Sequence, residues 1–128
     1  MQIMQTQPRA HQLKAAFFAC LVLLHFTAGC SSVTSNTTIK PKDSFLLGGN
    51  QHGAFQVQLK NVSRTALDVY HAPVDGGKHS SQTVQAGERI TVKVDRNTAL
   101  IIENKSDQTA AVDLYITGDS GLSMGYKN

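Results

Sequence analysis

Two histidines and an aspartate lie close together in one polar segment of the chain. His71, Asp75 and His79 surround the turn-forming sequence Ala-Pro-Val-Asp-Gly-Gly-Lys at 72–78. Imidazole and carboxylate groups are ligands for Zn²⁺ and Cu²⁺, and a hairpin here would bring the two imidazoles together. His52 could add a further ligand. The tight i, i+2 spacing of strong histidine sites on strands is absent, so histidines on a solvated loop explain the pattern equally well.

A second segment is similar to a catalytic sequence. Gly-Asp-Ser-Gly at 118–121 resembles the nucleophile segment of chymotrypsin-type serine proteases, but Leu122 stands where that family has another glycine. The family also needs a partner His and Asp, held by two barrels in a much larger chain. We therefore predict a turn at 118–121 and no catalytic residue.

Outward-facing side chains on two expected strands offer contacts rather than catalysis. Asp68 and Asp113 alternate with apolar residues, whereas general acid–base catalysis needs carboxylates that converge in a cleft. Tyr70 and Tyr115 each lie two residues further on. Because tyrosine is favoured at interfaces, these two and Tyr126 are candidate partner contacts, although tyrosines can equally cover the outer face of a sheet. The sequence predicts no enzyme and implies no cofactor.

Both cysteines, Cys20 and Cys30, lie in the amino-terminal region. Residues 1–14 carry basic and no acidic side chains, residues 15–26 are apolar apart from one histidine, and small residues precede Cys30. The apolar part is too short to cross a hydrocarbon core of about 30 Å as a helix. This three-part pattern is typical of an export signal. With both cysteines here, the remaining chain can form no disulfide and offers no thiolate for metal binding or catalysis.

The end of this region, Ala28-Gly29-Cys30, resembles the lipobox of bacterial lipoproteins. The resemblance covers residues 1–30 and implies a diacylglyceryl group on Cys30, removal of residues 1–29 and acylation of the new amino terminus. In that family, Ser31 after the cysteine implies passage to the outer membrane, on the leaflet that faces the periplasm. Thr27 stands where the family usually has leucine. The small residues also suit an ordinary signal peptidase, which would release a soluble periplasmic protein.

The charge balance argues against a nucleic-acid partner. The net charge of +3 includes Arg9 and Lys14 of the export signal, whereas all nine Asp and Glu lie after residue 30. The remainder therefore has a net charge of +1 and no run of basic residues. We expect no nucleic-acid binding.

The polar segment that follows Cys30 predicts a flexible tether. Residues 31–53 are rich in Ser, Thr, Asn, Gly and Lys, with a relaxed span of about 25 Å. Phe45 to Leu47 interrupt it, either as a first edge strand docked on the domain or as an exposed apolar contact for a partner. The expected organisation is a signal peptide at 1–29, lipidated Cys30 with its linker to residue 53, and a folded domain at 54–128.

The remaining chain shows the two-residue alternation of β-strands. Apolar residues alternate with polar ones, or run together for a central strand, in the segments 55–60, 67–70, 90–94, 99–103 and 112–117. Residues 122–128 are a further closing or edge strand, which could accept a strand from a partner if unpaired. Turn-forming residues separate the segments. We predict an all-β fold, a small antiparallel β-sandwich. Its layout is similar to immunoglobulin-like domains of exported bacterial proteins.

A weak internal repeat involves two turns. Lys60-Asn61-Val62-Ser63 is followed by a strand with outward Asp and Tyr, and Glu103-Asn104-Lys105-Ser106 is followed by another. Two similar halves would explain this repeat, and so would convergent turn chemistry.

These observations favour a membrane-anchored, periplasm-facing lipoprotein that acts as a non-catalytic binding or assembly module of the cell envelope. Its partners would be the membrane, through Cys30, and an envelope protein. The alternative is a periplasmic protein that binds a metal or small ligand through His71, Asp75 and His79.

Overall fold

The computed structural model describes residues 32–128, which form one compact unit. The expected signal peptide, with Cys20, and the expected lipidation site Cys30 lie outside this range. The described residues form nine strands: β1 (Ser32–Ile39), β2 (Ser44–Leu47), β3 (Phe55–Asn61), β4 (Leu67–Pro73), β5 (His79–Val84), β6 (Arg89–Val94), β7 (Thr98–Glu103), β8 (Ala110–Gly118) and β9 (Met124–Tyr126). No helix within residues 32–128 is long and apolar enough to span a membrane.

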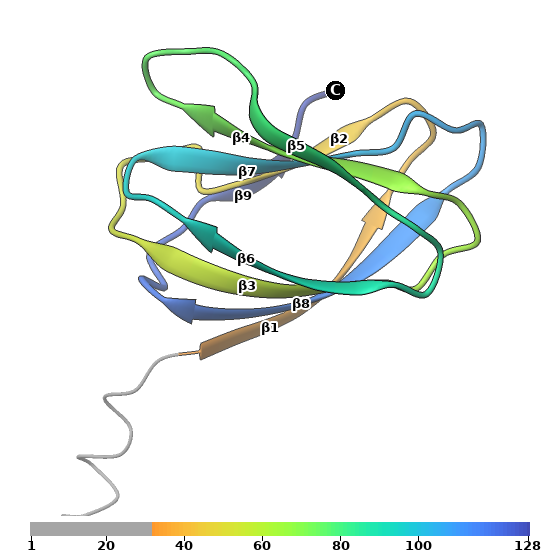
Figure 1. Cartoon of the computed structure of the whole chain (residues 1–128), viewed down its shortest axis with the longest axis horizontal. Coiled ribbons are helices and arrows are strands. Elements are labelled where there is room, and N and C mark those ends of the chain that lie inside the picture. The colour runs from red at the N-terminus through yellow and green to blue at the C-terminus, as the bar shows by residue number, and fades with distance from the viewer. Residues whose placement is uncertain (1–31) are drawn as a thin grey trace, which may run out of the picture. The chain divides into compact units, whose positions relative to one another are not determined.

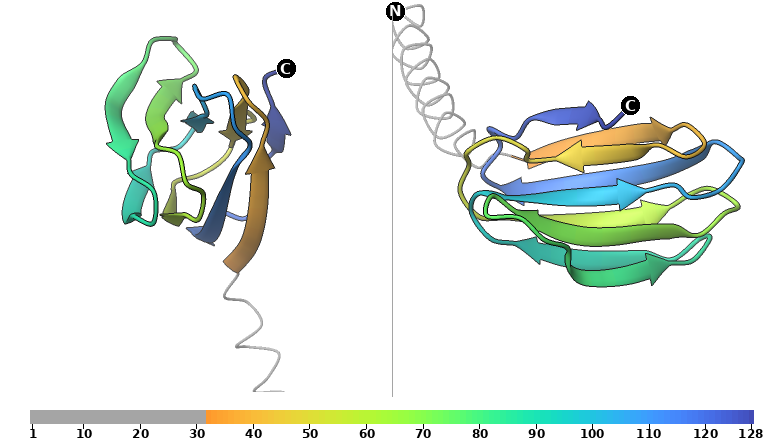
Figure 2. Two further views of the ribbon diagram at one scale, coloured as in Figure 1. Left: turned by 90° about the vertical axis from the view of Figure 1, so that its right-hand side faces the viewer. Right: turned by 90° about the horizontal axis from the view of Figure 1, so that it is seen from above.

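The strands form two antiparallel sheets that pack face to face, with the orders β1-β8-β3-β6 and β5-β4-β7-β2-β9 (Figure 1). The end-on view in Figure 2 shows the two layers. The predicted all-β sandwich is therefore confirmed. Its strand order is that of a jelly roll, because consecutive strands mostly pass from one sheet to the other, and β9 is added at one edge. The immunoglobulin-like arrangement expected from the sequence is not the one observed.

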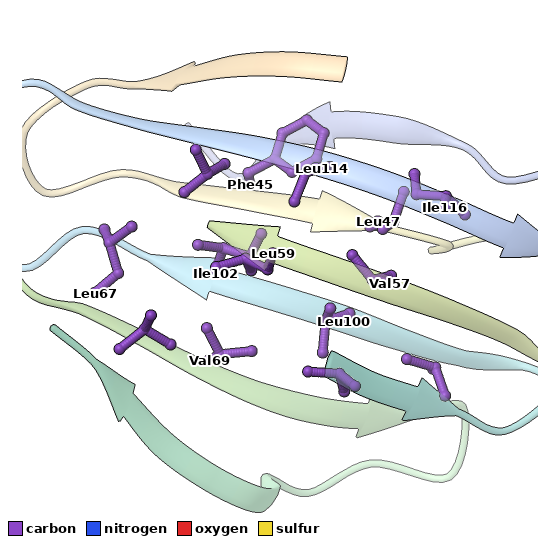
Figure 3. Close-up of a cluster of buried hydrophobic side chains, with 14 of the residues drawn as sticks. Phe45, Leu47, Val57, Leu59, Leu67, Val69, Leu100, Ile102, Leu114 and Ile116 are labelled. Atoms are coloured by element: carbon purple, nitrogen blue, oxygen red, sulfur yellow. The ribbon is translucent and has the colours of Figure 1, made fainter. Parts of the chain in front are cut away.

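The core lies between the sheets and is built by the alternation read from the sequence. Fully buried leucine, isoleucine and valine side chains from both sheets meet there, with Phe45 at one side (Figure 3). On β3, for example, Val57 and Leu59 are buried, while Gln58 between them is exposed. On β7, by contrast, the outward positions include Ala99 and Ile101, which are apolar and themselves buried.

Residues 32–53 belong to the sandwich, which corrects the expected tether and the domain start at residue 54. β1 pairs along its whole length with β8, from Ser32 opposite Thr117 to Ile39 opposite Ala110. β2 lies between β7 and β9, so Phe45 to Leu47 form an internal strand rather than an edge. Of the two interpretations of that apolar segment, docking on the domain is confirmed.

The connections gather at the two ends of the sandwich (Figure 1). We call one of them the Ser32 end, because β1 begins there; its loops are 48–54, 74–78, 95–97 and 119–123. We call the other the Asn-turn end; its connections are 40–43, 62–66, 85–88 and 104–109.

Candidate functional site

The predicted ligand residues His71, Asp75 and His79 come together at the Ser32 end. His71 on β4 and His79 on β5 are opposite each other, and Asp75 lies in the turn that joins the two strands. All three line one hollow of about 470 Å³, with Asp95 and Arg96 among its other walls. The hairpin suggested by the sequence is thus observed.

This hollow lacks the geometry of a metal centre. Nitrogen and oxygen ligands of Zn²⁺ must all lie about 2.0–2.2 Å from one point. Within residues 32–128, no three His, Cys, Asp or Glu side chains are placed to hold a metal ion. His52 is buried, with Nδ1 2.6 Å from the Gly53 carbonyl oxygen and Nε2 2.9 Å from that of Thr98. The metal-site hypothesis therefore has no support in the described part of the chain.

The three candidate contact tyrosines lie on different parts of the surface. Tyr70 is on the five-stranded sheet, with the Lys78 Nζ atom 4.2 Å from its ring centroid. Tyr115 is on the four-stranded sheet and is 43 % exposed. Tyr126 on β9 is 50 % exposed, and its hydroxyl donates a hydrogen bond of 2.7 Å to the Thr38 carbonyl on β1. Tyr126 thus links the edge strands of the two sheets, and the tyrosines do not form one contact patch.

The Gly-Asp-Ser-Gly segment ends β8 and enters a loop, as the turn prediction required. The Asp119 carboxylate accepts a hydrogen bond of 2.5 Å from the Gly53 amide and one of 2.8 Å from the Gly121 amide. These two bonds, the one from Gly53 first, hold the pKa of Asp119 below its ordinary value of 3.8. The carboxylate therefore fastens two loops at the Ser32 end to each other.

We expect acid to destabilise the domain partly through Asp119. Because its pKa is lowered in the folded state, the carboxylate contributes stability that is present above its ordinary value of 3.8 and is lost as the pH falls through the folded pKa. Calorimetric unfolding between about pH 5 and pH 2 should show a smaller loss of thermal stability for Asp119→Asn than for the wild type. Asp107→Asn, at a side chain 92 % exposed, should follow the wild type. An unchanged pH dependence in Asp119→Asn would contradict the expectation.

A second hollow lies at the Asn-turn end and was not recognised from the sequence. Its volume is about 310 Å³, and its walls are Thr65, Ala66, Asp68, Glu103, Lys105 and Ser106. These residues come from both Asn-containing turns and from β4 and β7, which lie side by side. We call it the inter-turn hollow.

The inter-turn hollow holds two carboxylates and one cation. Asp68 and Glu103 are directly opposite each other on β4 and β7. The Lys105 Nζ atom lies 2.8 Å from Asp68 Oδ2, and this hydrogen-bonded ion pair lowers the pKa of Asp68 and raises that of Lys105. Glu103 Oε1 is buried and has no hydrogen-bond partner among the described residues. The alternation of residues predicts Asp68 as an outward residue, but its neighbour Glu103 on β7 follows only from the sheet order.

The comparisons define a class of fold. The sequence matches no protein-family model and no curated protein. The capsular polysaccharide assembling protein CapF from Staphylococcus aureus has a similar fold, with a TM-score of 0.54 and 16 % identity over 69 % of this chain and 25 % of CapF. Procruciferin, an 11S globulin from Brassica napus, matches with a TM-score of 0.50 and 8 % identity over 73 % of this chain and 22 % of that chain.

The domain is thus a jelly-roll sandwich that spans about a quarter of the CapF chain. Two neighbours as different as a polysaccharide assembling protein and a plant globulin share this architecture. The likeness therefore shows the fold and assigns no activity.

Proposed function

We propose that this chain is a lipid-anchored lipoprotein of the bacterial outer membrane that faces the periplasm and binds an envelope partner without catalysing a reaction. The observation that carries it is the export-signal pattern that ends in Ala28-Gly29-Cys30. The first described strand, β1, begins at Ser32, two residues after the proposed lipidation site.

This short connection changes how the anchor would act. Two residues span at most about 7 Å, in place of the 25 Å or so of the expected tether. Each buried methylene of an acyl chain contributes about 0.8 kcal/mol, and stable attachment needs more than one chain. A lipidated Cys30 would therefore hold the Ser32 end at the membrane and leave the Asn-turn end accessible from the periplasm. Such confinement raises the effective concentration of the domain near other membrane proteins.

Replacing Cys30 tests the anchor, and Cys20 provides a matched control. The wild type and Cys20→Ser should incorporate labelled palmitate, remain in the membrane fraction, and give a mature mass that begins at residue 30 with added acyl groups. Cys30→Ser should incorporate no label. A wild-type protein that is recovered from the soluble fraction with an unmodified Cys30 thiol would refute the proposal.

The hollow lined by His71 and His79 favours a second candidate function, the binding of a small ligand at the Ser32 end. Calorimetric titration of the full chain with Zn²⁺ and with Cu²⁺ tests the metal form of this candidate. Heat that disappears in the His71→Ala and His79→Ala variants would support it, and a flat titration would exclude both metals as ligands.

A further inference from the structure

The strand β1 forms one edge of the four-stranded sheet. Within residues 32–128 it pairs with β8 alone, and Figure 1 shows it on the outer side of that strand. A strand at the edge of a sheet presents a row of amide and carbonyl groups that can pair with another chain. The side of β1 that faces away from β8 is called the β1 edge below.

The hydrogen bonds around β1 show which of its residues face this edge. In an antiparallel pair, every second residue directs its amide and carbonyl to the neighbouring strand, and the residues between direct theirs away. The Thr38 carbonyl points away from β8, because it accepts from the Tyr126 hydroxyl. The residue opposite, Ala111, likewise turns its carbonyl to the far side of β8, where it accepts from the Val62 amide. The other residues of β1 with this orientation are Ser32, Thr34 and Asn36.

The β1 edge lacks the protection that the other edges of the sandwich have. Folded proteins protect sheet edges with charged side chains, β-bulges or very short strands. β6 carries Arg89 and Lys93, β9 has three residues, and β5 has a register shift near Ser80, whose φ is 52°. β1 has eight residues in unbroken register with β8, and none of them is charged, glycine or proline. This edge is therefore the one open to strand addition.

We propose that the β1 edge binds an extended, uncharged segment of an envelope protein, which pairs antiparallel to β1 as a fifth strand of this sheet. The inference rests on the proposed binding function and names the chemistry of its partner. In strand addition, backbone hydrogen bonds supply affinity, and side chains at alternate positions supply selectivity. A charged residue of the partner would find no opposite charge on β1, whereas threonine and valine pair well with its small polar and β-branched side chains.

A hollow at the far end of the β1 edge is placed to receive one side chain of the partner. Its volume is about 250 Å³, and it is lined by Thr38, Lys40, Asp43, Tyr126 and Asn128. The hydrogen bond from Tyr126 to the Thr38 carbonyl holds the tyrosine ring beside the edge, and the ring is half exposed. Tyrosine is favoured at protein interfaces. The partner segment thus finds both a strand to pair with and a hollow beside it.

A second copy of this chain is a poorer occupant of the β1 edge. Two copies related by a two-fold axis would pair β1 with itself in antiparallel orientation, so that their Ser32 ends point in opposite directions. The eight residues of β1 are about 26 Å long, at about 3.3 Å per residue. With Cys30 lipidated, only one of the two Ser32 ends would then lie at the membrane. The structure therefore favours a different protein as the partner.

The probe is the peptide acetyl-Thr-MeVal-Thr-MeVal-Thr-MeVal-Thr-amide, in which MeVal is N-methylvaline, titrated into the isotopically labelled full chain and followed by NMR. The methyl groups remove the donors along one side, so the peptide pairs through its threonines and forms no larger sheet by itself. We expect saturable shifts for residues 32–38 and about tenfold slower exchange of the Thr34 and Asn36 amides, which become hydrogen-bonded. A control peptide with every residue N-methylated should bind about tenfold more weakly.

Proline in the β1 edge tests the contact with its backbone. Thr34→Pro removes an amide that faces away from β8, so β1 keeps its pairing with β8 while the peptide loses a donor and should bind about tenfold more weakly. Thr34→Val retains the amide and should bind as the wild type does. Thr91→Pro makes the same change on β6, at the opposite edge of the sheet, and should also leave binding unchanged.

The proposal is overturned if the peptide gives no saturable shift, if the control peptide binds equally well, or if Thr34→Pro is folded and binds like the wild type. An equal loss in Thr91→Pro would also overturn it. If Thr34→Pro does not fold, amide exchange in the wild type decides: slower exchange at Thr34 and Asn36 supports the proposal, and unchanged exchange overturns it. Sedimentation that shows a dimer in the wild type and none in Thr34→Pro would assign the edge to a second copy instead. Lipidation of Cys30 is measured separately by mass, so failure of the strand addition is distinguishable from failure of the anchor.

Discussion

Asn104→Ala is expected to lower the free energy of unfolding by about 3–5 kcal/mol. The Asn104 side chain is fully buried, and its amide group donates hydrogen bonds to the carbonyls of Ile39, Lys40 and Gln108 at 3.1, 3.2 and 2.7 Å. Alanine would remove all three of these bonds and the side-chain oxygen that accepts from the Ser106 amide, although the Lys40 carbonyl would keep the Asp43 amide and the Gln108 carbonyl the Ser106 hydroxyl as donors. Equilibrium unfolding in urea, followed by circular dichroism, measures the loss.

The control for this substitution is Asn36→Ala. Asn36 is exposed on β1 and donates one hydrogen bond to the Asp113 carboxylate, so its loss should change the stability by at most about 0.5 kcal/mol. Asn104→Asp should be at least as destabilising as Asn104→Ala, because a carboxylate cannot donate to the carbonyls. An Asn104→Ala variant as stable as Asn36→Ala would show that water replaces the lost amide.

The same arrangement occurs in the turn after β3, which gives the internal repeat a physical meaning. Asn61 is also fully buried, and its amide group donates to the carbonyls of Thr65 and Val84 at 2.8 and 3.1 Å. In each turn the serine two residues later donates to the asparagine side-chain oxygen through its amide and its hydroxyl. Asn61 thus fastens the β5–β6 connection, as Asn104 fastens the β1–β2 connection. Turn chemistry of this kind was visible in the sequence, but the second segment that each asparagine holds was not.

The sequence located the strands whose inward faces are apolar and missed two that are polar. β5 carries exposed side chains from His79 to Thr83, so its sequence lacks the alternation of apolar and polar residues that predicts a strand. The Ser, Thr and Asn content of β1 is typical of a tether, which is what its sequence predicts. Two of its inward positions are Ser35 and Thr37, whose hydroxyl groups lie 2.8 Å apart and satisfy each other. A polar pair that is satisfied internally can face a core, and composition alone does not distinguish it from a linker.

The candidate sites differ in the same way. One is formed by residues that are close together in the sequence, and the other by residues that only strand pairing brings together. His71, Asp75 and His79 belong to one hairpin, so a local pattern was enough to bring them together. Asp68 and Glu103 are neighbours only because β4 pairs with β7, and strand order depends on contacts across the whole chain. The immunoglobulin-like expectation had the same cause, since alternation predicts strands and not the order in which they pair.

Gly118→Ala is expected to destabilise the domain by about 2–4 kcal/mol. Gly118 ends β8 with a φ of 98°, a backbone conformation that side chains with a Cβ rarely adopt. An added Cβ would also lie 2.9 Å from the Ala54 carbonyl oxygen and 2.9 Å from the Phe55 Cα atom. Both neighbours are backbone atoms of the paired strand β3 and its approach, so relief requires that the two strands separate at the Ser32 end.

Two other glycines separate the conformational cost from the collision. Gly87 has a φ of 79° but nothing within 4 Å of an added Cβ, so Gly87→Ala should cost about 1 kcal/mol from conformation alone. Gly125 has neither a positive φ nor a close neighbour, and Gly125→Ala should be close to neutral. Urea unfolding of the three variants should therefore rank Gly118→Ala as the least stable and Gly125→Ala as the most stable. Equal losses for Gly118→Ala and Gly87→Ala would mean that the backbone of β3 moves aside at no cost, and that the Ser32 end is less firmly held than its paired strands indicate.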